Sequence, residues 1–295
     1  MVSPFIRRRR LADELRTLRE EREMTADELA KRIHYSRMKV SRLENAHGRP
    51  DVADVITILN TLEVNESKWT EVVRLAHEAT RKGWWDAYGN AMGARHRLYA
   101  DIESGAATIR EYNLSAIPGI LQTPELTSSL IEITKREGRL DFNPAKMVEA
   151  RLRRQQEILR PGGPKYEFII DEGVVRRRTV PRDVMAAQLQ HIVTVMMAEP
   201  QLTTRVLPIN ADMEGALLPK ATFALYTFPD PIDPPMAIVD TITTDLIHTE
   251  RREVRRYIQR YEDLTRGALS PEDSLALLTE AAELLIDEVG PPNDE

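Results

Sequence analysis

Apolar residues between positions 25 and 50 recur at the spacing of a helix. Leu29 and Ile33 are four residues apart, and Val40 and Leu43 are three apart. Each pair therefore lies on one face of a helix and can pack against the other pair. The short link at residues 34–35 leaves room only for a sharp corner. This pattern predicts two short helices joined by a tight turn.

Capping residues mark where both of these helices begin. Thr25 is followed three residues later by Glu28, which is the pattern of a capping box. Ser36 is a good N-cap for the second helix. A helix, a tight turn and a second helix form a helix-turn-helix, whose second helix enters the major groove of DNA. The alternative interpretation is an ordinary helical hairpin with a solvated basic face.

The side of the second helix that faces away from Val40 and Leu43 is polar and basic. We expect four of its side chains to contact base edges: Arg37, Met38, Ser41 and Arg42. An arginine can donate to both O6 and N7 of guanine, which is worth about 1–3 kcal/mol of base discrimination. A methionine can contact a thymine methyl group. The sequence therefore predicts sequence-specific recognition by this helix.

A second set of residues is expected to contact phosphates, which fixes the register on the duplex. These residues lie within or beside the two helices of the helix-turn-helix, or in a basic run near the start of the chain: Thr25, Lys39, Asn45, His47, Arg49, Arg8, Arg9 and Arg10. The last three belong to the basic run at residues 7–10, just before the first predicted helix. Positive charge at a helix start opposes the helix dipole, so a phosphate or minor-groove contact would explain it. A solvated flexible tail is the alternative.

The remaining pattern predicts a different architecture after residue 83. Helices are expected at 85–103, 124–136, 144–160, 182–198, 249–266 and 271–288, and strands at 107–113, 166–171, 202–207, 221–228 and 236–241. Three of the helices follow a capping residue and a proline, which is typical of helix starts. We predict an all-α domain at 1–83, a mixed α/β (α+β) sensor domain at 84–289 and a disordered tail at 290–295.

Charge is divided unevenly along a chain whose formal net charge is −6. Residues 1–83 hold 17 Lys and Arg against 14 Asp and Glu, whereas the other residues hold 24 against 33. A net charge of +3 followed by one of −9 suits a DNA-binding part joined to a sensor or partner-binding part. No apolar run approaches the ~20 residues of a membrane span, so we expect a cytoplasmic protein without membrane contact.

Residue types that carry catalysis are sparse. The chain has no cysteine, which excludes disulfides, thiolate metal sites and a cysteine nucleophile. Its six histidines form no metal-binding signature. The carboxylate pair Asp171–Glu172 is better explained as a turn or a helix start than as an acid–base pair. We therefore expect no enzyme, no metal and no cofactor.

Three segments of the first part resemble the phage-repressor-type helix-turn-helix family, often called the Xre family. They are L..ELR.LRE at 11–20, MTADELAKRI at 24–33 and SRMKVSRLENA at 36–46. The resemblance implies a five-helix bundle, base contacts from Arg37, Met38 and Arg42, and a structural ion pair between Arg19 and Glu44. His34 and Ala46 stand where the family usually has glycine, which puts the angle of the turn and the base register in question.

The second part also resembles a known group. The ordered segments PGILQTPEL (118–126), EARLRRQQEIL (149–159), IIDEGVVRR (169–177), QLQHIV (188–193), RVLP (205–208) and LSPEDSLALL (269–278) carry the resemblance. They are similar to the domain behind many actinobacterial Xre-type regulators, the WhiJ-like or antitoxin-like group. The resemblance implies a developmental or antibiotic-production regulator, often encoded beside a small acidic partner protein, and brings no catalytic residues.

Two function classes follow. The first is a transcriptional regulator that binds double-stranded DNA as a homodimer on a pseudo-palindromic operator and is controlled by a small-molecule effector or a small acidic protein. The second is an antitoxin-like module that sequesters a neighbouring small protein and autoregulates its operon. The apolar C-terminal helix at 271–288 is either the dimer contact or part of the core.

Overall fold

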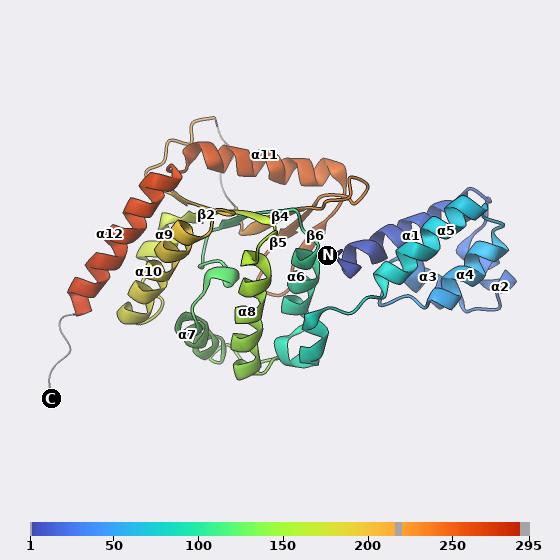
Figure 1. Ribbon diagram of the computed structural model, residues 1–295, viewed down its shortest axis with the longest axis horizontal. Coiled ribbons are helices and arrows are strands. Elements are labelled where there is room, and N and C mark those ends of the chain that lie inside the picture. Colours follow the sequence, from blue (N-terminus) through green and yellow to red (C-terminus); the bar gives the residue numbers. More distant parts are fainter. Residues whose placement is uncertain (1, 216–219, 290–295) are drawn as a thin grey trace. The chain divides into compact units, whose positions relative to one another are not determined.

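The computed structural model describes residues 2–215 and 220–289 (Figure 1). The chain divides into two compact units. The first, here called the head, is Met1–Ala87 with Arg97–Gly105, and the second, the body, is Tyr88–His96 with Ala106–Glu295. The head therefore includes a segment beyond the boundary that we expected at residue 83. The tail at 290–295, which we expected to be disordered, lies outside the described residues.

Five helices build the first part of the head. They are α1 (Pro4–Glu20), α2 (Ala26–Arg32), α3 (Arg37–Glu44), α4 (Val52–Thr61) and α5 (Glu66–Ala79). Each begins after a residue whose side chain accepts a backbone N–H of the first turn: Ser3, Thr25, Ser36, Asp51 and Asn65. The apolar faces of the five helices meet in one core that includes Leu15, Leu29, Val40, Leu59 and Val72. The expected all-α fold is confirmed.

The basic run at residues 7–10 lies inside α1, which corrects our placement of the run before the first helix and excludes the alternative of a flexible tail. Asp101 accepts hydrogen bonds at the start of α1 from the Ser3 hydroxyl (2.8 Å) and the Phe5 N–H (2.9 Å), and it forms an ion pair with Arg8 (3.1 Å). A carboxylate at this end of a helix complements the helix dipole. These contacts explain why residues 97–105 belong to the head.

The neighbouring arginines are also held within the head. Arg7 pairs with Glu78 at 3.1 Å, and Arg10 pairs with Glu71 at 3.2 Å. Arg8 and Arg10 are largely buried in these pairs. α5 and residue 101 thus already supply counter-charges to Arg8 and Arg10, whose phosphate contacts stay predictions. Arg9 is half-buried on the same helix, and its phosphate contact stays a prediction.

The body is built on a six-stranded mixed sheet with the strand order β3-β2-β1-β4-β5-β6. The strands are β1 (Thr108–Asn113), β2 (Lys165–Asp171), β3 (Leu202–Leu207), β4 (Phe223–Thr227), β5 (Met236–Val239) and β6 (Leu246–His248). β1, β2 and β3 are parallel, and β4, β5 and β6 continue the sheet with antiparallel pairings. Five of the six strands were expected, and the expected mixed α/β class is confirmed.

Helices cover both faces of the sheet (Figure 1). α11 (Arg251–Gly267) packs on the face that carries Tyr112, Ile169 and Phe223. The helices on the other side of the sheet include α8 (Pro144–Leu159) and α10 (Arg182–Ala198). The body also contains α7 (Pro124–Thr134), the short α9 (Glu172–Arg176), the 3-10 turn η2 (Gly119–Leu121) and α12 (Pro271–Val289). β2 is buried on both faces, which agrees with its nearly continuous apolar sequence.

The helix that we expected at 85–103 is interrupted. The chain instead forms a 3-10 segment, η1 (Trp84–Met92), followed by α6 (Ala94–Ser104). Gly89 and Gly93 have φ values of 51° and 72°, a left-handed conformation that glycine adopts without a steric penalty. These two glycines end the regular helix, although their spacing alone fits a continuous one.

Two segments of the body whose roles the sequence left open make structural contacts. Asp171 caps α9 by accepting the Gly173 N–H (2.9 Å), and Glu172 accepts the Ile209 N–H (2.9 Å). On α12, Leu278 is buried, and the Ser274 hydroxyl accepts the Val206 N–H (2.9 Å). One face of α12 therefore belongs to the core of the body. Among the described helices, none combines the length and apolar character needed to cross a membrane.

Candidate nucleic-acid interface

The turn between α2 and α3 is as sharp as the sequence predicts. α2 ends at Arg32 and α3 begins at Arg37, and the Tyr35 N–H donates back to the Ala30 carbonyl at 2.9 Å. Val40 is fully buried in the head core, and Leu43 packs against the same core. These two contacts fix which side of α3 points away from the protein.

All four side chains that we expected to contact bases lie on the exposed side of α3: Arg37, Met38, Ser41 and Arg42. Met38 is 72% exposed, so its side chain is accessible to a thymine methyl group. Arg37 makes only a loose ion pair with Asp27, at 3.6 Å between two well-exposed side chains. Arg42 forms no ion pair with any residue in 2–215 or 220–289. The two guanidinium groups are therefore accessible to a ligand outside the head.

A buried ion pair holds the end of α3 against α1. Arg19 donates to both carboxylate oxygens of Glu44, at 2.7 and 2.9 Å, and to the Met24 carbonyl at 2.6 Å. Both side chains are about nine-tenths buried. The hydrogen bond with Glu44 raises the pKa of Arg19, so the guanidinium stays charged. This is the structural pair that the resemblance implied.

Sequence reasoning missed a second contact at the same place. Arg16 donates to the Glu44 carbonyl and to the Asn45 side chain, which lie at the end of α3. A cation at a helix C-terminus is favourable because the last carbonyls carry partial negative charge. The spacing between Arg16 and Arg19 could have revealed it, because residues three apart on a helix share a face.

Two of the predicted phosphate contacts are paired with carboxylates inside the head. Lys39 lies 2.7 Å from Asp54, and this hydrogen bond raises the pKa of the lysine. Arg49 lies 2.6 Å from Asp86. The side chains of Lys39 and Arg49 are 43% and 37% exposed, so both cations are accessible from solvent. The phosphate contacts of Lys39 and Arg49 stay predictions.

The three other candidates lie around the ends of α2 and α3. The Thr25 hydroxyl accepts the Glu28 N–H (3.2 Å) and the Glu28 carboxylate accepts the Thr25 N–H (2.7 Å), as the capping box requires. Asn45 donates to the Ser41 carbonyl at 2.7 Å, and His47 is exposed. Local contacts therefore use Thr25 and Asn45 in part, and the phosphate contacts of all three stay predictions.

Both positions that depart from the family's glycines adopt the conformation that glycine favours. His34 and Ala46 each have a φ of 56°. A left-handed residue with a Cβ costs about 1–2 kcal/mol in a helix and less for short polar side chains. The left-handed backbone conformation is therefore retained at both positions in spite of local strain.

Replacing Ala46 by glycine is expected to raise the free energy of unfolding of the head by up to about 1 kcal/mol, because it removes that strain. Thermal unfolding of the full chain, followed by NMR of head resonances, measures the change. Ala53→Gly is the matched control, because Ala53 is exposed within α4 and glycine there costs about 1 kcal/mol. Equal destabilisation by both substitutions would contradict the strain at Ala46.

Two family models match different parts of the chain. A family model described as "Helix-turn-helix domain" matches residues 10–71, which cover most of α1, all of α2, α3 and α4, and the start of α5. A model described as "Domain of unknown function (DUF5753)" matches residues 96–280, more than half of the chain. Neither a curated protein nor a solved structure matches the chain. The head is thus a helix-turn-helix DNA-binding domain, and the chain as a whole belongs to the DUF5753 family.

Proposed function

We propose that this protein is a sequence-specific transcriptional regulator whose α3 reads base edges in the major groove. The observation that supports this most directly is the exposed group of Arg37, Met38, Ser41 and Arg42 on a helix that is anchored on its other side. Arginine and methionine on that surface fit guanine edges and thymine methyl groups. The Arg19–Glu44 pair keeps this surface in a fixed orientation before DNA arrives.

Replacing Arg42 by alanine is expected to weaken operator binding by about 1–3 kcal/mol and to relax selectivity at one base pair. Genome-wide footprinting identifies the operator, and equilibrium binding to a set of singly substituted operators then measures affinity and selectivity. Arg32→Ala is the matched control, because Arg32 is exposed on α2 and lies outside the outward face of α3. An Arg42→Ala protein with wild-type affinity and selectivity would contradict the assigned base contact.

We further propose that the protein acts as a homodimer. Two recognition helices about 34 Å apart would then enter successive major grooves of a pseudo-palindrome. Leu284 and Ile286 of α12 are about half exposed and offer apolar surface for such a contact. Sedimentation of the full chain with and without operator DNA tests this proposal. A monomer under both conditions would contradict it.

The body is proposed to control the head by binding an effector, without catalysing a reaction. A small acidic protein is one candidate, and the exposed arginines Arg251, Arg252 and Arg255 of α11 support it, since they form a basic surface on an otherwise acidic body. The resemblance to WhiJ-like regulators also favours such a partner. An antitoxin-like role, in which the body sequesters this partner and the head autoregulates the operon, would use the same surface.

Co-expression with the product of a neighbouring short acidic gene distinguishes the two roles. In a regulator, the bound partner changes operator affinity. In an antitoxin-like protein, the complex neutralises the partner's own effect on growth, and this neutralisation persists when Arg42→Ala has weakened operator binding. Failure of the two proteins to co-purify would contradict control by this partner.

A further inference from the structure

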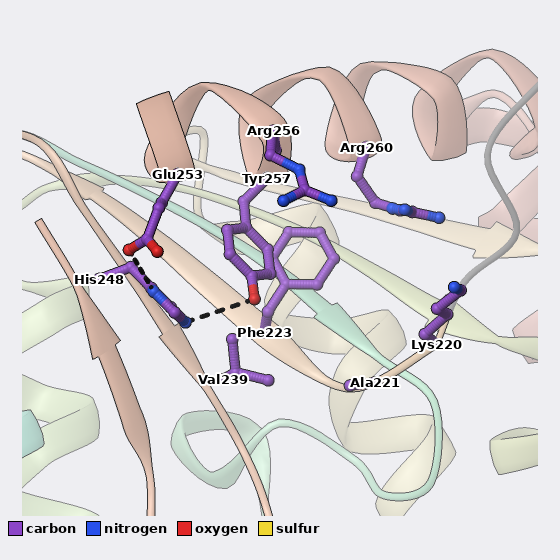
Figure 2. A pocket seen from close by; sticks show the side chains of 9 residues that line it. All are labelled: Lys220, Ala221, Phe223, Val239, His248, Glu253, Arg256, Tyr257 and Arg260. Carbon is purple, nitrogen blue, oxygen red and sulfur yellow. Dashed lines mark hydrogen bonds and ion pairs between the residues drawn. The ribbon is translucent and has the colours of Figure 1, made fainter. Parts of the chain in front are cut away.

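A cavity of about 240 Å³ opens between α11 and the antiparallel side of the sheet (Figure 2). Strands β4, β5 and β6 and helix α11 all contribute side chains to it. Ligand pockets usually measure about 300–1,000 Å³, so this cavity suits a small molecule. It lies entirely within the body, on the face of the sheet opposite α8 and α10.

Aromatic and aliphatic side chains form the inner part of the cavity. Phe223 of β4 and Tyr257 of α11 lie with their ring centroids 5.4 Å apart and their planes tilted by 54°. Val239 of β5 adds an aliphatic surface beside them (Figure 2). Phe223 and Val239 are largely buried from solvent. This arrangement favours a flat apolar group, since aromatic rings pack well in offset or edge-to-face contacts.

The cavity's carboxylate already has a partner. Glu253 lies 2.7 Å from Nδ1 of His248, and Nε2 of the same histidine lies 3.5 Å from the Tyr257 hydroxyl. Figure 2 shows these three side chains as a connected row on one side of the cavity. Glu253 is therefore oriented towards the histidine, which leaves the other side of the cavity dominated by positive charge.

That other side carries Arg256 and Arg260 of α11, with Lys220 beyond them (Figure 2). Arg252, Arg256 and Arg260 follow one another at intervals of four residues, and like charges at this spacing destabilise a helix. Arg256 is exposed and forms no ion pair within the described ranges 2–215 and 220–289. A bound anion beside Arg256 would offset the repulsion along this face.

We propose that this cavity binds a small organic anion in which a carboxylate is attached to a flat aromatic ring. The ring lies against Phe223, Tyr257 and Val239, and the carboxylate accepts hydrogen bonds from Arg256. Use of the cavity as an effector site depends on the proposed regulatory function, whereas binding of the anion does not. Binding of such a molecule would make the conformation of the body depend on the concentration of a metabolite.

The test measures binding of 1-naphthoate to the full chain by isothermal titration calorimetry, with saturation-transfer NMR as a second readout. The neutral 1-naphthamide and inorganic phosphate are the matched probes, because each keeps one half of the proposed chemistry. We expect naphthoate to bind at least about tenfold more tightly than either, since a hydrogen bond to a charged group is worth about that factor or more.

Arg256→Gln is expected to weaken naphthoate binding by about tenfold or more. Arg255→Gln is its control, because Arg255 is the adjacent exposed arginine and does not line the cavity. Equal binding of naphthoate and naphthamide, equal binding of phosphate and naphthoate, or an unaffected Arg256→Gln protein would each overturn the proposal, as would the absence of any naphthoate binding. Because binding is measured directly, its outcome is independent of whether Arg42→Ala impairs operator recognition.

Discussion

Replacing Glu44 by alanine is expected to lower the free energy of unfolding of the head by about 3–5 kcal/mol. The substitution leaves the Arg19 guanidinium buried without the carboxylate that accepts two of its hydrogen bonds, at 2.7 and 2.9 Å. An unpaired buried charge is far more costly than the net benefit of the pair. Operator binding should be lost with it, because the same pair connects the end of α3 to α1.

Hydrogen exchange of the full chain, followed by mass spectrometry, measures this effect on α1 and α3 separately from the body. The matched control is the double substitution Arg19→Met with Glu44→Leu. Apolar residues of similar volume often replace a buried ion pair at little cost, so the double variant should recover most of the protection. Wild-type protection in Glu44→Ala would contradict a stabilising role of the carboxylate.

Replacing Asp101 by alanine is expected to cost about 3 kcal/mol or more, although residue 101 is distant in sequence from the helix it caps. The change removes the acceptor of the Ser3 hydroxyl and the Phe5 N–H and the counter-charge of Arg8. Burial raises the pKa of Asp101, in spite of its hydrogen bonds from Phe5 and Arg8, so the charge itself is costly to bury. Asp101→Asn, which keeps an acceptor without the charge, should therefore cost less than Asp101→Ala.

Pulse proteolysis in a urea gradient, with head fragments identified by mass, measures the stability of both variants. Asp13→Ala is a suitable control, because Asp13 is an exposed carboxylate of α1 itself. If Asp101→Ala and Asp13→Ala unfolded at the same urea concentration, residues 97–105 would have no role in stabilising the head.

The sequence predicts the helix-turn-helix well because its signals are local. The caps at Thr25 and Ser36 and the spacing of Val40 and Leu43 act within one or two turns, so neighbouring residues determine which side of α3 is exposed. The same locality explains why the ion pairs of Arg8 and Arg10 were not predicted. Their partners, Asp101 and Glu71, come from distant segments, and no rule of spacing connects them.

The body shows the same limit in its sheet and its cavity. The strand sequences reveal β1 and β4, but not that Thr108 is paired with Thr227 across the sheet. β6 has only three residues, too few for an alternating pattern to be recognised. The cavity combines side chains from three strands and α11, so it exists only after those long-range pairings are known.

The assignment of Arg97–Gly105 to the head has a consequence for protein engineering. A chimera that joined residues 1–87 to a foreign sensor would leave Arg8 and the first turn of α1 without Asp101. A chimera that uses this DNA-binding domain must therefore include residues 97–105, joined to residues 1–87 by a linker that replaces residues 88–96.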